Sequence, residues 1–347
     1  MTITKELHSP NLPDDDWNIV GDIGQPAYTN SWVAYGGAFA APAFRKDSDG
    51  WVHLRGLAKS GTLGTALFTL PDGYRPIRDI YTVAMCDANV AAYVRVIASS
   101  GQVVVASSTG TNGYASISNV KFPAWSSYDR YDGRITRLAN PNWEQRTGSD
   151  IELASSIIEH ANGMGCLLGI HGVTTGSASS GINIGKLAPH YSYVGHAVDS
   201  TSSIKRFDFS TRYGIFTNAS TSTWTILPAS MIPMKSEVEF AYRSPTLVNS
   251  WTSLAFNTSN RHSPLGFYKD ADGFVYLRGL ATGGSSASAT IFTLPAGFRP
   301  SATVLLSSIS AAGTCRIDVT SAGVVSAVAG GSTGWNSLDG LCFYADQ

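Results

Sequence analysis

The sequence KDSDGWVHLRGLA at residues 46–58 returns as KDADGFVYLRGLA at residues 269–281, with ten of the thirteen positions identical. Farther along, FTLPDGYRP at residues 68–76 returns as FTLPAGFRP at residues 292–300, with seven of nine positions identical. Two matched motifs in the same order, at nearly the same separation, are the signature of a duplicated structural unit. The chain therefore contains two copies of one module.

The extent of each copy follows from the residues that flank these motifs. Trp32 and Trp251 precede the two copies at similar distances, and looser matches continue beyond the second motif. We place the modules at residues 30–124 and 249–347, with an N-terminal attachment arm at 1–29 and a different central domain at 125–248. Three folded units suit a chain of 347 residues.

Each module carries the marks of antiparallel strands. Asp49-Gly50 and Asp272-Gly273 are hairpin turn signals, because glycine reaches positive φ at little cost. Val52 and Leu54 alternate with polar or aromatic neighbours, as on a strand with one face in the core. Short strands at about ten-residue spacing follow, separated by Gly and Asp turns. The predicted fold class is mainly β, with two antiparallel, jelly-roll-like β-sandwich modules.

The central segment has a different sequence pattern, and we predict it to be α+β or strand-rich. Ser149-Asp150-Ile151-Glu152 fits a capping box, and apolar residues recur behind it at helical spacing. Gly163 suits the end of that helix, which we place at residues 150–162. Short apolar strands are expected from Cys166, from Tyr213 and from Ser222 onward.

Composition excludes several classes of protein. The formal net charge is −1 and charged residues make up 14% of the chain, which leaves no basic surface for nucleic acid. No run of about 18 apolar residues predicts a membrane span, and the first residues do not form a secretory signal. Four cysteines without a paired spacing predict free thiols and a reducing site of synthesis.

Catalytic and metal chemistry have weak support. His160, His171, His190 and His196 lie in the central segment with Cys166 and Asp199, but at no spacing typical of a metal site. The many carboxylates there could supply the pair that a glycan-degrading enzyme needs. Asp47, Asp49, Asp270 and Asp272 resemble the opening of a calcium loop, but turn chemistry explains them better. We predict no catalytic residue, no metal and no cofactor.

Binding of sugars has a better candidate surface. Sugars present C–H patches and hydroxyl groups, so their sites combine aromatic faces with planar polar groups. The strand face opposite the aliphatic one offers that mixture in both copies, although the same face could instead pack on a neighbouring subunit or sheet. The candidate binding residues are Trp51, His53 and Arg55 in the first copy, and Tyr276, Arg278 and Trp335 in the second.

The motifs also resemble a known group of proteins. Four stretches of the second copy, at 269–284, 291–300, 317–325 and 334–346, are similar to the β-sandwich heads of bacteriophage tail fibre, upper baseplate and minor structural proteins. The first copy matches the opening motifs and departs at its end. The resemblance covers about 190 residues of the chain and most of the central segment lies outside it.

The resemblance implies a virion structural protein in the phage tail, with host-surface glycan as receptor. It implies a homotrimer, tail or baseplate partners, no membrane insertion, and synthesis in the bacterial host cytoplasm. A capsid or neck decoration protein is the alternative, and a glycan-degrading enzyme in the central segment is a second one. If the N-terminal arm anchors the chain, receptor contact is expected at Tyr276, Arg278 or Trp335 more than at Trp51 or Tyr114.

Overall fold

The computed structural model describes residues 17–76, 79–87, 90–107, 110–111, 113–124, 241–254 and 262–346, and the backbone of the strands between 135 and 233. The elements with defined bounds are β-strands, and their pairings are antiparallel throughout. They form three modules, each with one small and one large sheet. The mainly β fold expected from the sequence is confirmed.

The first module (residues 17–124) pairs a small sheet of four strands with a large sheet of seven. The order in the small sheet is β1 (Asn18–Ile19), β3 (Ala43–Lys46), β4 (Trp51–Arg55) and β11 (Val120–Pro123). The order in the large sheet is β2 (Val33–Ala34), β5 (Leu57–Lys59), β10 (Ala115–Ser116), β7 (Ile80–Cys86), β8 (Val90–Val96), β9 (Gln102–Ala106) and β6 (Ala66–Thr69).

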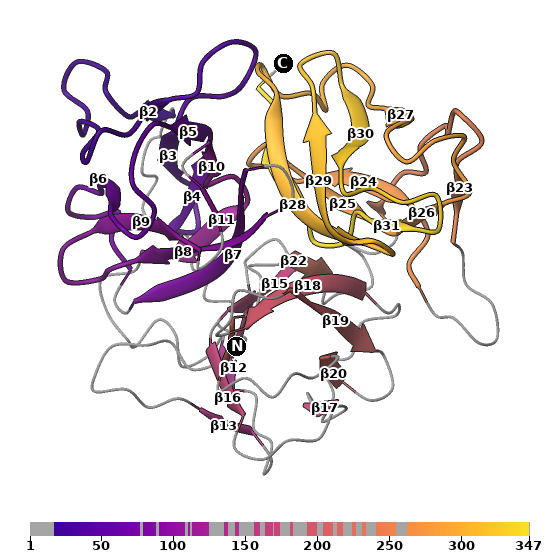
Figure 1. The fold of residues 1–347 in the computed structure, drawn as a ribbon, viewed down its shortest axis with the longest axis horizontal. Helices are drawn as coiled ribbons and strands as arrows, with labels where there is room; N and C mark the ends of the chain where they lie inside the picture. The colour runs from indigo at the N-terminus through magenta and orange to yellow at the C-terminus, as the bar shows by residue number, and fades with distance from the viewer. Residues whose placement is uncertain are drawn as a thin grey trace, which may run out of the picture.

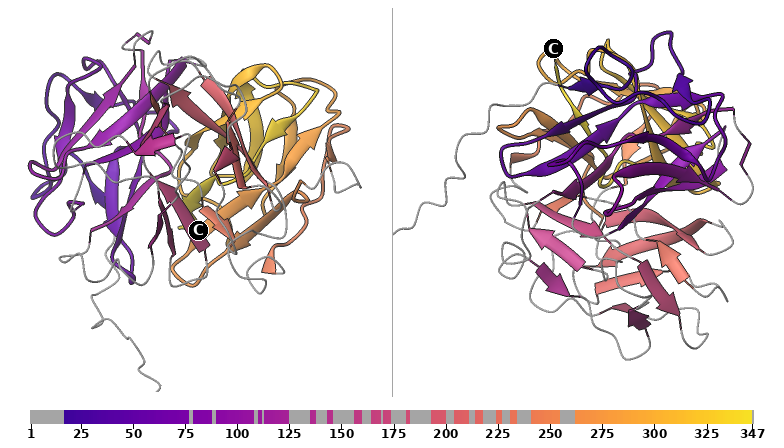
Figure 2. Two further views of the ribbon diagram at one scale, coloured as in Figure 1. Left: turned by 90° about the horizontal axis from the view of Figure 1, so that it is seen from below. Right: turned by 90° about the vertical axis from the view of Figure 1, so that its left-hand side faces the viewer.

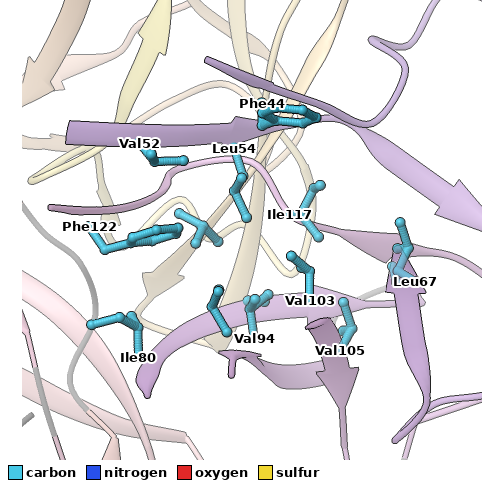
Figure 3. Packing of buried hydrophobic residues seen from close by; sticks show 14 of the residues in the cluster. Phe44, Val52, Leu54, Leu67, Ile80, Val94, Val103, Val105, Ile117 and Phe122 are labelled. Carbon is cyan, nitrogen blue, oxygen red and sulfur yellow. The ribbon is translucent and has the colours of Figure 1, made fainter. Parts of the chain in front are cut away.

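The space between these two sheets holds the core of the first module. Figure 3 shows Leu54 pointing from the small sheet toward the large one, and Phe44 belongs to the same buried cluster as Leu54, Val94 and Val103. These four side chains are at most 2% exposed. Burying such a side chain contributes about 1.5–3 kcal/mol. The aliphatic strand face predicted from Val52 and Leu54 is therefore the core face.

The third module (residues 241–346) repeats this arrangement. Its small sheet orders β24 (Gly266–Lys269), β25 (Phe274–Arg278) and β32 (Cys342–Tyr344), and Arg243 bridges Phe267 where the first module has β1. Its large sheet orders β23 (Thr252–Ser253), β26 (Leu280–Thr282), β31 (Asn336–Ser337), β28 (Val304–Ser310), β29 (Gly313–Val319), β30 (Val324–Ala329) and β27 (Thr290–Thr293).

The middle module has the same strand order again. Its small sheet orders β12 (Ile135–Arg137), β14 (Ser156–Glu159), β15 (Met164–Leu168) and β22 (Met231–Pro233). Its large sheet orders β13 (Trp143–Gln145), β16 (Ile170–Val173), β21 (Trp224–Ile226), β18 (Tyr193–Asp199), β19 (Ile204–Ser210), β20 (Gly214–Thr217) and β17 (Gly181–Ile182). The segment is strand-rich, as one of the two expectations had it, and it is a third copy of one topology.

The helix predicted at residues 150–162 is wrong where the structure describes it. Ser156–Glu159 is strand β14, paired with β15 through Ser156↔Leu168 and Glu159↔Gly165. A capping box is a local preference, and cross-strand pairing overrides it here. The β-branched pair Ile157-Ile158 suits a strand at least as well as a helix.

The predicted hairpin turns are confirmed. Gly50 and Gly273 have φ of 83° and 90°. Asp47 Oδ1 accepts hydrogen bonds from the N–H groups of Asp49 and Trp51, at 3.0 and 2.9 Å. Asp270 Oδ1 accepts one from Phe274 N–H at 2.8 Å. These aspartates cap turns, as turn chemistry predicts.

The three modules lie around a common centre (Figure 1). The equivalent strands β7, β18 and β28 contact one another there, so each large sheet brings the same strand to the middle. Phe39 of the first module forms a parallel bridge with Thr303 of the third. The right-hand view of Figure 2 shows the middle module below the other two. One chain thus forms a three-membered ring.

Part of the segment at residues 1–29, which we expected to be an attachment arm, is folded onto the modules. Trp17 packs edge-on against Tyr344 of the third module, and β1 joins the small sheet of the first. Trp32, which follows it, is 1% exposed in the core of the first module. Residues 17–29 therefore belong to the first module, and residues 1–16 lie outside the described residues.

Candidate functional site

The strand face expected to bind sugars lies between the first and third modules. Trp51, His53 and Tyr276 are at most 4% exposed, and Arg278 is 6% exposed. The His53 ring stacks on Phe274 with 3.8 Å between centroids. Phe274, Tyr276 and Cys342 belong to the same buried cluster as Trp51. The structure therefore uses this face to pack neighbouring modules, which was the alternative reading of the same residues.

At this interface, one aspartate in each module contacts a ring side chain of the same module, at equivalent positions. His53 Nε2 lies 2.8 Å from Asp47 Oδ2, and the Tyr276 hydroxyl donates to Asp270 Oδ2 at 2.7 Å. Burial, and then the neighbouring Asp270 carboxylate, raises the pKa of Tyr276 well above its usual value. The phenol therefore stays protonated and acts as a hydrogen-bond donor. Each aspartate holds its own hairpin turn and also orients an interface ring.

The arginines of this face also have structural partners. Arg55 lies over the Trp17 ring and Arg278 over the Tyr242 ring, each with 4.1 Å from guanidinium carbon to centroid. Arg55 also pairs with Asp346 of the third module at 3.0 Å. Cation–π contacts of this kind contribute about 0.5–2 kcal/mol. They are repeated because they hold equivalent parts of the two modules.

The other repeated residues also support the scaffold. Lys46 Nζ donates to Gly73 O at 2.9 Å, and Lys269 Nζ to Gly297 O at 2.7 Å. Arg75 Nε and Arg299 Nε donate to the carbonyls of Leu70 and Leu294, at 2.9 and 2.8 Å. These bonds fix the LPxGxRP loop beside the hairpin. The repeated motif therefore marks the fold, and differences among ligands must come from residues that the copies do not share.

Trp335 is the candidate that reaches the surface most directly in the third module. It is half-buried and packs with Leu254 on the buried pair Leu280 and Ile309. Its equivalent in the first module, Tyr114, lies 3.5 Å from Arg316 Nη1 of the third module. Tyr114 is therefore an interface residue, whereas Trp335 stands at the base of two partly exposed loops, 283–288 and 329–334.

These two loops lie side by side. Gly283 N–H donates to Thr333 O at 2.8 Å, and Thr282 Oγ1 donates to Gly334 O. A Cβ placed on Gly331 would lie 2.6 Å from Ala287 O. The loops and Trp335 form one continuous surface, which we call the Trp335 surface. It combines backbone hydrogen-bonding groups, small side chains and one indole.

The described cysteines are buried free thiols. Cys86, Cys315 and Cys342 form no disulfide. Burial raises the pKa of Cys86 to about 11 and the pKa values of Cys315 and Cys342 to about 12. A thiol with so high a pKa is a poor nucleophile at neutral pH. The side chain of Cys166 lies outside the described residues.

Candidates for metal binding and hydrolysis fall mostly beyond the described side chains. Within the described residues, no group of three or more His, Cys, Asp or Glu side chains could hold a metal ion. His160, His171, His190, His196 and Asp199 lie where side chains are not described. In the same described part of the chain, no helix is long and apolar enough to cross a bilayer.

A small cavity lies at the interface between the first and third modules. Its volume is about 20 Å³, and its lining includes Trp17, Arg55, Lys121 and Cys342. A space of this size holds one water-sized particle and is far below the hundreds of Å³ of a typical ligand pocket. A sugar does not fit there.

Comparison with known proteins returned no match. No family model, no curated protein and no solved structure is significantly similar to this chain.

Sequence reasoning missed the third copy and the interface role of the aromatic face. The repeated signal was present: Leu54-Arg55-Gly56-Leu57 corresponds to Leu167-Leu168-Gly169-Ile170 in the middle segment. Asn162-Gly163 precedes that stretch as Asp49-Gly50 precedes the first one. A search for a glycine turn followed by Leu-x-Gly-Leu/Ile would have located the copy.

Proposed function

We propose that this chain is a structural component of a bacteriophage virion, a tail fibre or baseplate-type protein that contacts glycans on the host surface. The observation that carries the proposal is the repeated motif at residues 46–58 and 269–281, with its resemblance to the heads of phage tail proteins. The arrangement of three sandwiches of one topology supports it, because such a ring presents several similar surfaces outward.

Glycan contact belongs on the Trp335 surface in this proposal. Tyr276, Arg278, Trp51 and His53 are at most 6% exposed, so a sugar cannot reach them in the folded chain. Trp335 is half-buried beside loops 283–288 and 329–334. An indole face with adjacent backbone N–H and C=O groups suits the C–H patches and hydroxyls of a sugar ring.

Competition with phage adsorption tests the proposal. The purified chain should reduce adsorption of the phage to host cells, and Trp335→Ala should lose that competition while its melting temperature stays within a few degrees. Leu254→Ala, a neighbour in the same cluster, controls for loss of packing. A Trp335→Ala chain that melts and competes like the unmodified chain would remove Trp335 from the site.

Location within the particle is tested separately. Immunogold labelling should mark the tail tip, whereas label on the capsid or neck would favour a decoration protein. Shortening of host polysaccharide by the purified chain would favour the enzyme alternative.

The oligomeric state distinguishes an assembly of three chains from a ring of three modules within one chain. The sequence and its resemblance predict a homotrimer. The ring offers another possibility, because the aromatic strand face that was expected to bind a neighbouring subunit is covered by a neighbouring module of the same chain. Light scattering separates the two, since one ring has the chain mass of 36.7 kDa and a homotrimer has three times that mass.

A further inference from the structure

Lys121 places a buried ammonium group between the first and third modules. The residue is 1% exposed, and its Nζ donates to Asn119 Oδ1 at 2.9 Å. None of the ion pairs among the described residues involves it. A buried charge is costly unless a counter-charge or several hydrogen bonds compensate it. The Asn119 amide oxygen and the Cys342 sulfur take up at most two of the three protons of the ammonium, and neither carries a full negative charge.

Lys121 lines the small cavity between the first and third modules, and two further hydrogen-bond donors line the same cavity. Trp17 Nε1 and Arg55 Nε are buried, and no hydrogen-bond acceptor among the described residues reaches either atom. Buried N–H groups rarely stay without an acceptor, because each such group costs about 1–3 kcal/mol. Two N–H groups without acceptors, at a cavity that a buried ammonium group also lines, indicate a ligand that accepts hydrogen bonds.

The contacts of Lys121 supply no counter-charge. The Cys342 side chain is within hydrogen-bond reach of Lys121, but it is a neutral thiol because burial raises its pKa to about 12. Asp346 binds Arg55 through Nη1, and the Asp47 carboxylate faces His53. Lys121 and Arg55 line the cavity, whereas no carboxylate does.

We propose that this cavity binds one small monatomic anion, chloride or bromide, held by Lys121, Trp17 and Arg55. The volume of about 20 Å³ matches a particle the size of one water molecule and is too small to enclose sulfate, phosphate or a carboxylate ligand. An anion accepts hydrogen bonds from every donor and needs no acceptor in return, whereas water would bring two donors of its own to a donor-rich site. The anion would neutralise the interface and stabilise the contact between the two modules.

Thermal unfolding of the full chain in chloride, bromide and gluconate tests the proposal at constant ionic strength, which holds screening fixed. The midpoint should rise with halide concentration by on the order of 2–3 °C per tenfold increase once the site is mostly filled. It should not rise with gluconate, which is too large to enter. Crystals soaked in bromide should show an anomalous peak at contact distance from Lys121 Nζ.

Substitutions inside and outside the cavity test whether the halide-dependent rise in the midpoint comes from this site or from a general effect of salt. Lys121→Met should abolish the halide-dependent rise, and a folded chain is expected because the equivalent strand positions hold Met231 and Cys342. Lys269→Met, which removes a lysine outside this cavity, should keep the rise. If Lys121→Met fails to fold, Trp17→Phe provides the second test and should weaken the halide dependence.

Equal midpoints in halide and gluconate, or no bromide peak in the cavity, would overturn the proposal. An unchanged halide dependence in both cavity variants would overturn it as well.

Discussion

The Arg55 guanidinium of the first module forms an ion pair with the Asp346 carboxylate of the third, with 3.0 Å between Nη1 and Oδ2 across 291 positions of sequence. Asp346 also accepts hydrogen bonds from the N–H and hydroxyl of Ser301. Burial by itself would raise the pKa of Asp346, but the bonds from Ser301 and Arg55 outweigh it and lower the pKa. The carboxylate form is therefore favoured in the folded chain.

Asp346→Asn should destabilise the ring in a way that depends on pH. Because the folded pKa of Asp346 is lowered, its contribution is present above the unfolded pKa of about 3.9 and is lost as pH falls through the folded value. We expect a loss of about 1–2 kcal/mol at pH 7, which shrinks below pH 4. Urea unfolding at pH 7 and pH 3 measures it, and an equal loss at both pH values would contradict the role of the charge.

Trp32 and Trp251 occupy equivalent positions but have different hydrogen bonds. Trp251 Nε1 donates to Ala289 O at 3.2 Å, whereas buried Trp32 Nε1 has no acceptor among the described residues. Replacing either with Phe loses similar volume, but Trp251→Phe also leaves a carbonyl without its donor. We expect Trp251→Phe to cost about 1 kcal/mol more than Trp32→Phe in denaturant unfolding. Equal costs would mean that the hydrogen bond contributes nothing.

Gly279 and Gly297 both need a positive φ, but only Gly279 also lacks space for a side chain. Both have positive φ, of 94° and 84°. A Cβ on Gly279 would lie 2.6 Å from the Leu265 backbone, whereas a Cβ on Gly297 would meet nothing within 4 Å. Gly297→Ala should cost about 1–2 kcal/mol, from backbone strain. Gly279→Ala should cost at least about 2 kcal/mol more, because the backbone itself must move. Similar melting temperatures for the two variants would contradict the close approach.

Ser48 and Asp272 offer a test of ring closure within one chain. Ser48 Oγ donates to Asp272 Oδ1 at 2.9 Å, between the hairpin turns of the first and third modules. The double variant Ser48→Cys, Asp272→Cys should form a disulfide that raises stability by on the order of 3–5 kcal/mol at most, since it closes a long loop.

The cross-link should leave the chain a monomer on a non-reducing gel. Each single-cysteine variant serves as the control, and cross-linked dimers or trimers from the double variant would show that modules of different chains meet instead.

Much of the fold could be predicted from local signals. Turn residues such as Asp49-Gly50, together with alternation at Val52 and Leu54, located the strands of the first and third modules. The middle copy was missed because its sequence has Asn162-Gly163 where the first copy has Asp49-Gly50, and because the residues before it fit the pattern of a capped helix. Local propensity could not show that Ser156–Glu159 pairs with a strand that follows it.

The candidate site was harder to predict for a physical reason. Alternation along a strand shows which side chains share a face, but it carries no information about what covers that face. His53 and Tyr276 were correctly placed opposite the aliphatic residues, and the third module covers His53 through Phe274. The Trp335 surface is built by contact between loops 283–288 and 329–334, which sequence spacing alone does not show.

Because the three modules belong to one chain, equivalent positions near their shared centre can hold different residues. In an assembly of identical chains, every substitution near the axis appears three times, so one lysine would bring two more of the same charge. Here the equivalent strand positions hold Lys121, Met231 and Cys342, each the partner of a different residue, His53, Cys166 or Tyr276. Fusion into one chain lets a single charge occupy a place where a triplet would repel itself, and each module can diverge independently of the other two.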